Sequence, residues 1–394
     1  MSAHVIADDA EALAVARALA DEFRPGADER DRERRLPRAE LDRLSASGLL
    51  AVTVPAEHGG ADVGAATLAE IFRLLAAADG SLAQIPQSHF VYVNVIRRQG
   101  TEQQRKFFFA ELLAGRRFGN AQSEAGTRHV QDIRTRLTLR PDGSYLLTGV
   151  KHYSTGALFA DWIGVLARAE SDDLHVAYVP RDAPGVTVVD DWDGMGQRTT
   201  ASGTVRLTDV EVPADRVLPH HLTFQGPQLH GAVAQLLHAA IDAGLAAGAL
   251  AQAAEFVRTT SRPWFESGVD TAAEDPLIIQ RFGELGVETR ASQALLREAA
   301  RAVEDAKADL TDDSAAEASL AVAAAKAHAA RTAVDVANAL FELAGTRSAL
   351  NSLNLNRHWR DARTHTLHDP ARWKIQHIGR HVLSGTRPPR HGLL

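Results

Sequence analysis

The chain has 394 residues, 45% of them hydrophobic and 24% charged, a composition typical of globular proteins with two or three domains. Its formal net charge of −7 argues against binding nucleic acid through overall charge, and no apolar run reaches the ~18 residues that span a membrane. The absence of cysteine excludes disulfides, thiolate metal sites and cysteine nucleophiles. Because the N-terminal segment has neither a basic region nor an apolar run, we expect no secretory signal and a cytoplasmic protein.

Residues 1–118 are predicted to form a helical domain. Apolar residues recur at helical spacing from Ala12 to Phe23, and Pro25 with Gly26 ends this pattern. Thr101 is a candidate N-cap for a later helix, and Gly115 is a candidate residue just beyond that helix. The pattern predicts further helices over residues 37–47, 67–78 and 101–114.

Residues 119–222 change to a β pattern. Apolar and polar residues alternate over 133–139, the sequence Pro141-Asp142-Gly143 predicts a turn, and a return strand follows over 144–150. Further short strands are predicted over residues 162–167, 174–179, 185–189 and 204–212. Short strands at this spacing indicate a small antiparallel barrel or sandwich.

Residues 223–394 are helical again and rich in alanine. The stretches 228–259 and 317–343 carry apolar or small residues on nearly every face, which is typical of helices buried on all sides. We therefore expect a C-terminal four-helix-bundle domain with a tail. Such helices need more partners than one bundle provides, so we expect a homo-oligomer, and specifically a homotetramer.

The order of these domains, together with four local motifs, resembles the acyl-CoA dehydrogenase superfamily. The motifs are two flavin-side segments, an exit from the β domain and a segment before the catalytic base, at residues 149–156, 194–203, 210–218 and 360–363. The resemblance implies an α+β multidomain fold with an N-terminal α-helical domain, a central small antiparallel β-barrel and a C-terminal α-helical bundle.

The sequence departs from the dehydrogenases after the last motif. In that family a glutamate removes the substrate proton, whereas here Asp369 stands at the glutamate position and Pro370 replaces a glycine. Because aspartate is one methylene shorter and a base must lie within ~3 Å of its proton, this exchange weakens the case for proton abstraction. Residues 363–370 instead resemble the branch of flavin-dependent monooxygenases similar to dibenzothiophene monooxygenase and the sulfur-acquisition oxidoreductases.

That branch implies a two-component monooxygenase. FMN, reduced by a separate NAD(P)H-dependent flavin reductase, would react with O2 to give a flavin hydroperoxide that oxygenates a small organosulfur substrate. FAD is the alternative cofactor. No glycine-rich dinucleotide fingerprint is present, which agrees with reduction by another protein. The alternatives are an FAD-dependent acyl-CoA dehydrogenase, a hydroxylase of an aromatic or amino-sugar substrate, and a binding protein that has lost its chemistry.

Three residues of the 363–370 segment are the candidate catalytic group. His365 and His368 can give and take a proton because histidine titrates near neutral pH, and Asp369 could orient one of them. On spacing alone, surface or helix-cap positions would be favoured for both histidines, and the flanking resemblance favours the catalytic role. A metal site is not expected, because carboxylate partners other than Asp369 are lacking. The resemblance places His89 at the mouth of the active site, while an apolar neighbourhood also fits a core histidine.

The resemblance also assigns cofactor contacts. An arginine fork pairs well with phosphate, so Arg262 and Arg347 are candidates for the flavin phosphate, with surface ion pairs as the alternative. Asp361 stands where this branch is expected to have asparagine. The remaining candidates could equally be turn residues or a core aromatic, and they are Tyr92, Asn120, Ser123, Ser154, Thr155, Trp192 and Ser202.

Overall fold

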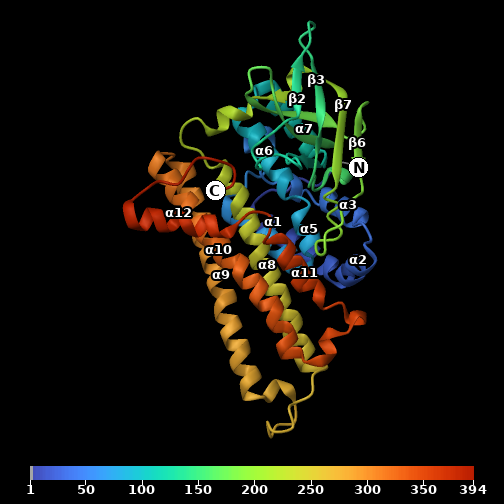
Figure 1. The fold of residues 1–394 in the computed structure, drawn as a ribbon, viewed down its shortest axis with the longest axis vertical. Helices are drawn as coiled ribbons and strands as arrows, with labels where there is room; N and C mark the ends of the chain where they lie inside the picture. Colours follow the sequence, from blue (N-terminus) through green and yellow to red (C-terminus); the bar gives the residue numbers. More distant parts are fainter. Residues whose placement is uncertain (1–2) are drawn as a thin grey trace.

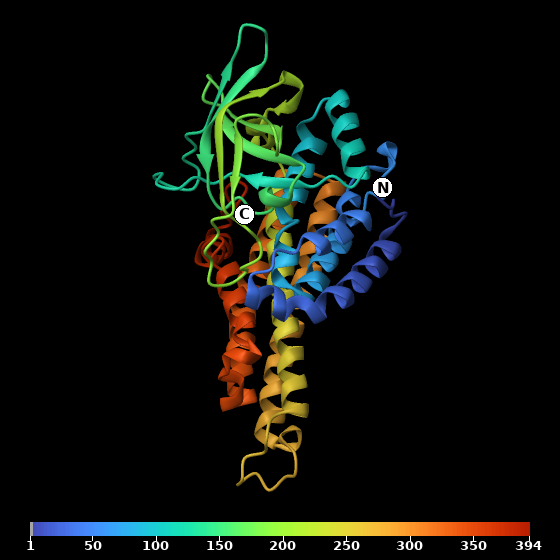
Figure 2. The same cartoon turned by 90° about the vertical axis from the view of Figure 1, so that its right-hand side faces the viewer.

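The computed structural model describes residues 3–394, and the first two residues of the segment read for a targeting signal lie outside it. The β domain lies at one end of the molecule and the long C-terminal helices extend to the other (Figure 1). The N-terminal helices pack along one side of these long helices (Figure 2). This arrangement confirms the expected fold class, with helical, β and helical regions in chain order.

The N-terminal region contains the four predicted helices and three that sequence patterns missed. Thr101 and Gln104 form a capping box, and Gly115 follows the helix with φ +85°, as predicted. His89 lies inside one of the missed helices, whose β-branched and aromatic residues have low helix propensity and are held by packing. The helices are α1 (Asp9–Phe23), α2 (Ala27–Glu33), α3 (Arg38–Ala46), α4 (Ala65–Ala78), α5 (Gly80–Gln84), α6 (Gln87–Gln99) and α7 (Glu102–Leu113).

The β domain is one curled eight-stranded sheet with the order β6-β7-β3-β2-β4-β5-β8, in which β1 also pairs with β4. Most pairs are antiparallel as predicted, but β1 and β2 run parallel to β4. Strand β1 was not predicted because its four residues show no alternation, so Asn120 lies in a strand rather than in the expected loop. The strands are β1 (Phe118–Ala121), β2 (Arg136–Leu139), β3 (Tyr145–Lys151), β4 (Trp162–Arg168), β5 (Leu174–Pro180), β6 (Val186–Val189), β7 (Thr204–Val212) and β8 (Val217–Leu218).

The C-terminal region is built around a buried central helix, α8, which packs against α4 and α10. Helix α8 is long and apolar enough to cross a membrane, but 83% of its apolar window is buried inside the protein, as in a core helix. Its small residues allow close packing, since a Cβ at Gly244 would lie 2.4 Å from the carbonyl oxygen of Arg73 on α4. The helices are α8 (His230–Thr259), α9 (Pro276–Ala308), α10 (Asp312–Ala344), α11 (Asn356–His365) and α12 (Ala371–Ser384).

Candidate active site

The predicted flavin contacts of the β domain meet in one hydrogen-bonded group. The Tyr92 hydroxyl on α6 donates to Asn120 Oδ1 over 2.9 Å, and Asn120 Nδ2 donates to the carbonyl of Tyr153 over 3.2 Å. The backbone N–H of Asn120 donates to the carbonyl of Thr155 over 3.0 Å. The Asn120 side chain is therefore fixed between α6 and the loop that follows β3.

Hydroxyl groups continue this arrangement toward Trp192. Thr155 Oγ1 lies 2.7 Å from Ser202 Oγ, which lies 2.8 Å from Thr200 Oγ1. The Thr200 hydroxyl and the indole N–H of Trp192 both donate to the carbonyl of Gln197, over 3.0 and 2.9 Å. We call Tyr92, Asn120, Thr155, Trp192, Thr200 and Ser202 the polar cluster.

Ser154 carries a buried hydroxyl beside the polar cluster. Its residue is 1% exposed, and its Oγ has no hydrogen-bond partner among the described residues, although its backbone N–H donates to Gly203. A buried hydroxyl without a partner costs ~1–3 kcal/mol, so such a group fits a position where a polar ligand supplies the missing bond. Ser123 joins this region through its backbone, because its carbonyl accepts from the N–H of His152 over 2.8 Å.

His89 is a core histidine in this structure. It is 1% exposed, its Nε2 lies 2.8 Å from the carbonyl of Leu50, and its Nδ1 accepts from the N–H of Phe118 over 3.0 Å. Burial lowers the pKa of His89 to about 4, so the ring is neutral at pH 7. Both ring nitrogens are engaged, which favours the core interpretation and fixes α6 against β1.

His365 on α11 is held by residues of α8 and α10 that sequence patterns missed. Its Nδ1 lies 2.5 Å from Asp242 Oδ1, and Lys326 donates to Asp242 Oδ2 over 3.0 Å. On its other side, His365 Nε2 lies 3.1 Å from His238 Nδ1. These four side chains, which we call the bundle relay, are each at most 2% exposed. Within residues 3–394, no group of three or more histidine or carboxylate side chains is placed to hold a metal ion.

His368 lies against this relay but remains open to solvent. Its ring stacks on His238, with 3.9 Å between the centroids and 34° between the planes, and the residue is exposed. Desolvation by the surrounding protein lowers the pKa of His368 to about 4, with help from the positive charges of Lys326 and Lys374. The water that reaches the ring opposes this lowering, but the imidazole is neutral at pH 7. His368 therefore presents a neutral ring to solvent.

Asp369 does not orient a histidine through a hydrogen bond. Its carboxylate forms a buried ion pair with Lys374, which also donates to the carbonyl of Leu393 over 2.7 Å. Burial raises the pKa of Asp369, but the charges of Lys326 and Lys374 outweigh this effect, and the net pKa is lowered. A carboxylate held in this way is a poor proton acceptor. The carboxylate that lies within hydrogen-bond distance of a histidine of this segment is Asp242, which contacts His365.

Arg262 and Arg347 lie away from the polar cluster of the same chain. Arg262 is exposed in the loop between α8 and α9, and Arg347 is exposed in the turn after α10. The two segments are linked, because the Ser261 hydroxyl donates to the carbonyl of Ala344 over 3.3 Å. The α8–α9 loop forms the tip of the bundle farthest from the β domain (Figures 1 and 2). The segments that carry the two arginines therefore lie together, at the end of the bundle away from the β domain.

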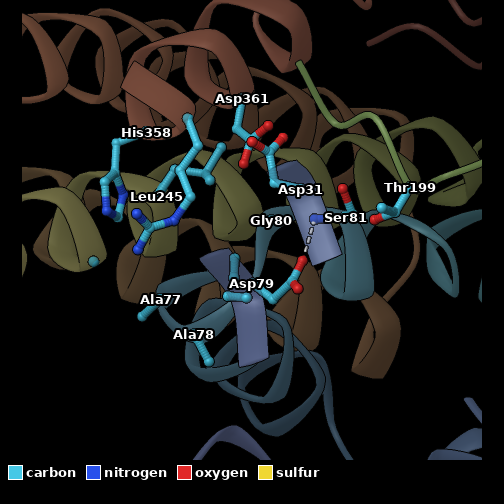
Figure 3. A pocket seen from close by; sticks show the side chains of 14 residues that line it. Asp31, Ala77, Ala78, Asp79, Gly80, Ser81, Thr199, Leu245, His358 and Asp361 are labelled. Atoms are coloured by element: carbon cyan, nitrogen blue, oxygen red, sulfur yellow. Dashed lines mark hydrogen bonds between the residues drawn. The ribbon is translucent and has the colours of Figure 1, made fainter. Parts of the chain in front are cut away.

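Asp361 joins α11 to the loop that carries Trp192. It accepts a hydrogen bond from the backbone N–H of Gln197 over 2.5 Å. Figure 3 shows its carboxylate close to that of Asp31, at a cavity of about 20 Å³ that Asp79 also lines. Burial and repulsion from Asp31 and Asp79 raise the pKa of Asp361 to about 7. Asp31 and Asp79 each pair with an arginine, whereas Asp361 has no ion pair among the described residues.

Three family models match most of this chain, one for each region of the fold. Residues 8–116 match the acyl-CoA dehydrogenase N-terminal domain, residues 118–210 the middle domain and residues 236–373 the C-terminal domain. The chain therefore belongs to the acyl-CoA dehydrogenase family, as the sequence motifs predicted.

Named relatives place the chain in the monooxygenase branch of this family. It is 36% identical to a dibenzothiophene monooxygenase of Rhodococcus erythropolis, over 97% of this chain and 95% of the relative. It is 33% identical to a probable FMNH2-dependent monooxygenase, SfnC, of Pseudomonas putida, over 98% of each chain. The crystal structure of FMN-bound TdsC from Paenibacillus sp. A11-2 superposes with a TM-score of 0.92 at 33% identity, covering 97% of this chain and all of that chain.

Proposed function

We propose that this protein is a reduced-FMN-dependent monooxygenase that inserts one oxygen atom from O2 into a small organosulfur compound. The names of its relatives support the reaction, the FMN-bound relative supports the cofactor, and dibenzothiophene is itself an organosulfur compound. FMN is preferred over FAD on the same grounds.

The state of Asp369 carries this proposal against the dehydrogenase alternative. An acyl-CoA dehydrogenase needs a free carboxylate at this place to remove a substrate proton. Here the carboxylate is tied to Lys374 and its pKa is lowered, so it has little tendency to accept a proton. The neighbouring His368 is open to solvent and neutral, so its ring nitrogens can hold or move a proton.

The residues of the β domain fit a bound flavin. Asn120, Thr155 and Ser202 offer hydrogen-bonding groups for the polar edge of the ring, and Trp192 offers a flat wall. The unpaired Ser154 hydroxyl independently indicates a missing polar partner here. When bound, reduced FMN supplies the electrons that activate O2. Buried hydrogen bonds among these side chains hold their groups in place before the flavin arrives.

The proposed assembly is a cytoplasmic homotetramer served by a separate NAD(P)H-dependent flavin reductase. Helices α9 and α12 expose large apolar side chains, which typically mark contacts between subunits, namely Leu277, Ile279, Val287, Trp373, Ile375, Val382 and Leu383. In such an assembly, Arg262 and Arg347 would serve the flavin phosphate of a neighbouring copy, because their segments lie at the end of the bundle away from their own chain's β domain. Light scattering at micromolar concentration should give a tetramer, and a monomer would contradict this assignment.

The decisive experiment follows the oxygen atom. The purified protein is mixed with FMN, NADH and an unrelated flavin reductase under ¹⁸O2, and given a thioether, a sulfone or an alkylsulfinate. We expect a product that contains one ¹⁸O atom and that forms only when the reductase is present. An aromatic hydrocarbon and an amino sugar serve as substrates for the alternative hydroxylase reading.

A dehydrogenase would behave differently in the same preparation. It would transfer electrons from an acyl-CoA to bound FAD without O2, which bleaches the flavin absorbance. Acyl-CoA bleaching together with no ¹⁸O product from any sulfur compound would overturn the proposed function. Oxidation of NADH by the protein alone, at the rate of turnover, would contradict the need for a reductase.

A further inference from the structure

The donors and acceptors of the bundle relay restrict which ring nitrogens of its histidines can carry a proton. The Lys326 ammonium has only donors, so Asp242 Oδ2 must accept from it. The other oxygen, Oδ1, lies 2.5 Å from His365 Nδ1, and an ionised carboxylate has only acceptors. His365 Nδ1 must therefore carry a proton. We take His365 in its neutral form, in which the opposite charges of Lys326 and Asp242 balance each other within the group.

The position of the proton on His365 also determines which nitrogen of His238 is protonated. A neutral His365 protonated at Nδ1 has a lone pair at Nε2, so the 3.1 Å contact requires His238 Nδ1 to be the donor. His238 is then protonated at Nδ1 and bare at Nε2. Burial lowers the pKa of His238 well below its usual value, which keeps this ring neutral. Each tautomer in the relay thus follows from the charge on Asp242.

We propose that Lys326, Asp242 and His365 are positioning residues that fix the tautomer and orientation of His238, whose ring in turn sets the position of His368. The stacked contact between the two rings is the only link this requires, because His368 makes no hydrogen bond to another described side chain. His365 is accordingly not a catalytic residue: both its nitrogens are occupied, and it is 2% exposed. The inference rests on the proposed function only for the reaction that His368 serves.

One substitution separates this relay from a purely structural polar group. In Asp242→Asn, the side-chain atom that faces Lys326 must be the amide oxygen, because lysine only donates. The amide nitrogen then faces His365 and donates to Nδ1, which forces the proton of His365 to Nε2. His365 now donates to His238 Nδ1, and the proton of His238 moves to its Nε2. A single exchange that removes the carboxylate charge therefore inverts two tautomers.

The first measurement needs no flavin. NMR of the full-length protein with ¹⁵N-labelled histidine distinguishes protonated from bare ring nitrogens, and His365→Phe and His238→Phe assign the two rings. We expect Nδ1–H tautomers for both rings in the wild type and Nε2–H tautomers for both in Asp242→Asn. Glu288→Gln is the matched control, because Glu288 lies 3.2 Å from His328 Nε2 in the same bundle and outside the relay. That control should leave both relay tautomers unchanged.

The second measurement is turnover with pre-reduced FMN. Asp242→Asn should lower kcat about 10- to 100-fold, as for other residues that orient a reactive group, while KM and FMN affinity change less than about twofold. Asp242→Glu keeps the carboxylate, so it should retain the wild-type tautomers and recover most of kcat. Glu288→Gln should turn over like the wild type.

The two proposals fail in different ways. A wild-type His238 that is protonated at Nε2, or is doubly protonated near pH 7, overturns the relay, even if Asp242→Asn does not fold. An Asp242→Asn protein with inverted tautomers and unchanged kcat overturns its positioning role. A wild-type protein that oxygenates nothing, yet shows the expected tautomers, overturns the proposed function while the relay geometry stands.

Discussion

The two sides of the candidate site are built in opposite ways. The polar cluster of the β domain uses neutral hydroxyl, amide and indole groups, and beside it Ser154 leaves one hydroxyl unpaired. The bundle relay contains a buried ion pair. Both oxygens of Asp242, both ring nitrogens of His365 and Nδ1 of His238 have partners. The first wall is therefore suited to accept a ligand, and the second to hold one imidazole in a fixed state. Helix α11 connects the two, through Asp361 and His365.

The largest expected effect tests directly whether His368 is the group that moves a proton. His368→Ala should lower the oxygenation rate ~10²- to 10⁴-fold, because a group that moves a proton contributes about this much. FMN affinity and thermal stability should change little, since the residue is exposed. The measurement is single turnover with pre-reduced FMN, with His4→Ala at an exposed N-terminal site as control.

Asp369→Asn completes this test. It leaves Lys374 buried without its partner, so we expect its effect to fall first on stability and less on the rate. A His368→Ala protein with the wild-type rate, together with a folded but inactive Asp369→Asn protein, would assign the chemistry to the carboxylate and contradict our assignment.

The sequence predicts the polar cluster better than the bundle relay for a physical reason. Half of the polar cluster, namely Thr155, Thr200 and Ser202, lies in the contiguous motifs at residues 149–156 and 194–203, so a local resemblance finds this part. The bundle relay joins residues 84 to 127 positions apart, on three helices. Periodicity carries no information about such contacts.

A weak signal for the relay was nevertheless present. His238 and Asp242 are polar residues four positions apart in a helix of mostly small and apolar residues, and a polar group buried on all sides needs a partner. The same reasoning applies to Lys326 in α10, which is 1% exposed. The domain order was predictable because its hydrophobic periods are strong. Helices α2, α5 and α6 were missed, the last because packing overrides its low propensity.

The second prediction concerns the buried charges of the relay. Lys326→Met leaves Asp242 charged and without its ammonium partner, which should lower the free energy of unfolding by about 3–5 kcal/mol. The double variant Lys326→Met with Asp242→Asn should lose less, because no charge stays buried. Denaturant unfolding at fixed protein concentration measures both. The control is Arg43→Met, since the exposed Arg43–Glu22 pair should be worth about 1 kcal/mol or less. Equal losses of unfolding free energy for Lys326→Met and Arg43→Met would show that the relay charges are not effectively buried.

The third prediction concerns Asp361, the connection between the two walls. Its pKa is raised to about 7 in the folded protein, whereas aspartate in an unfolded chain titrates near ~3.9. The folded protein thus keeps a proton that the unfolded chain has lost, and stability falls as pH rises from about 4 to about 7. Asp361→Asn removes this dependence and can still accept from Gln197. Its gain in Tm over the wild type should therefore grow from pH 5 to pH 8.

The control for that titration is Asp270→Asn, at an exposed position in the loop before α9. Its Tm difference from the wild type should not depend on pH in this range. A constant difference for Asp361→Asn as well would show that Asp361 is ionised throughout, and would remove it as a pH-dependent connection.

The smallest expected effect distinguishes a satisfied hydroxyl from an unsatisfied one within the same wall. Ser154→Ala removes an Oγ that has no partner in the protein, so stability without flavin should stay unchanged or rise slightly. If the flavin is its missing partner, FMN binding should weaken about three- to tenfold, the value of one hydrogen bond. Ser202→Ala breaks contacts to Thr155 and Thr200, so it should lower both the Tm and the FMN affinity. Thermal unfolding and fluorescence titration with FMN measure the two quantities separately. An equal loss of Tm in the two variants would mean that Ser154 is bonded within the protein, and an unchanged FMN affinity in Ser154→Ala would place the flavin elsewhere.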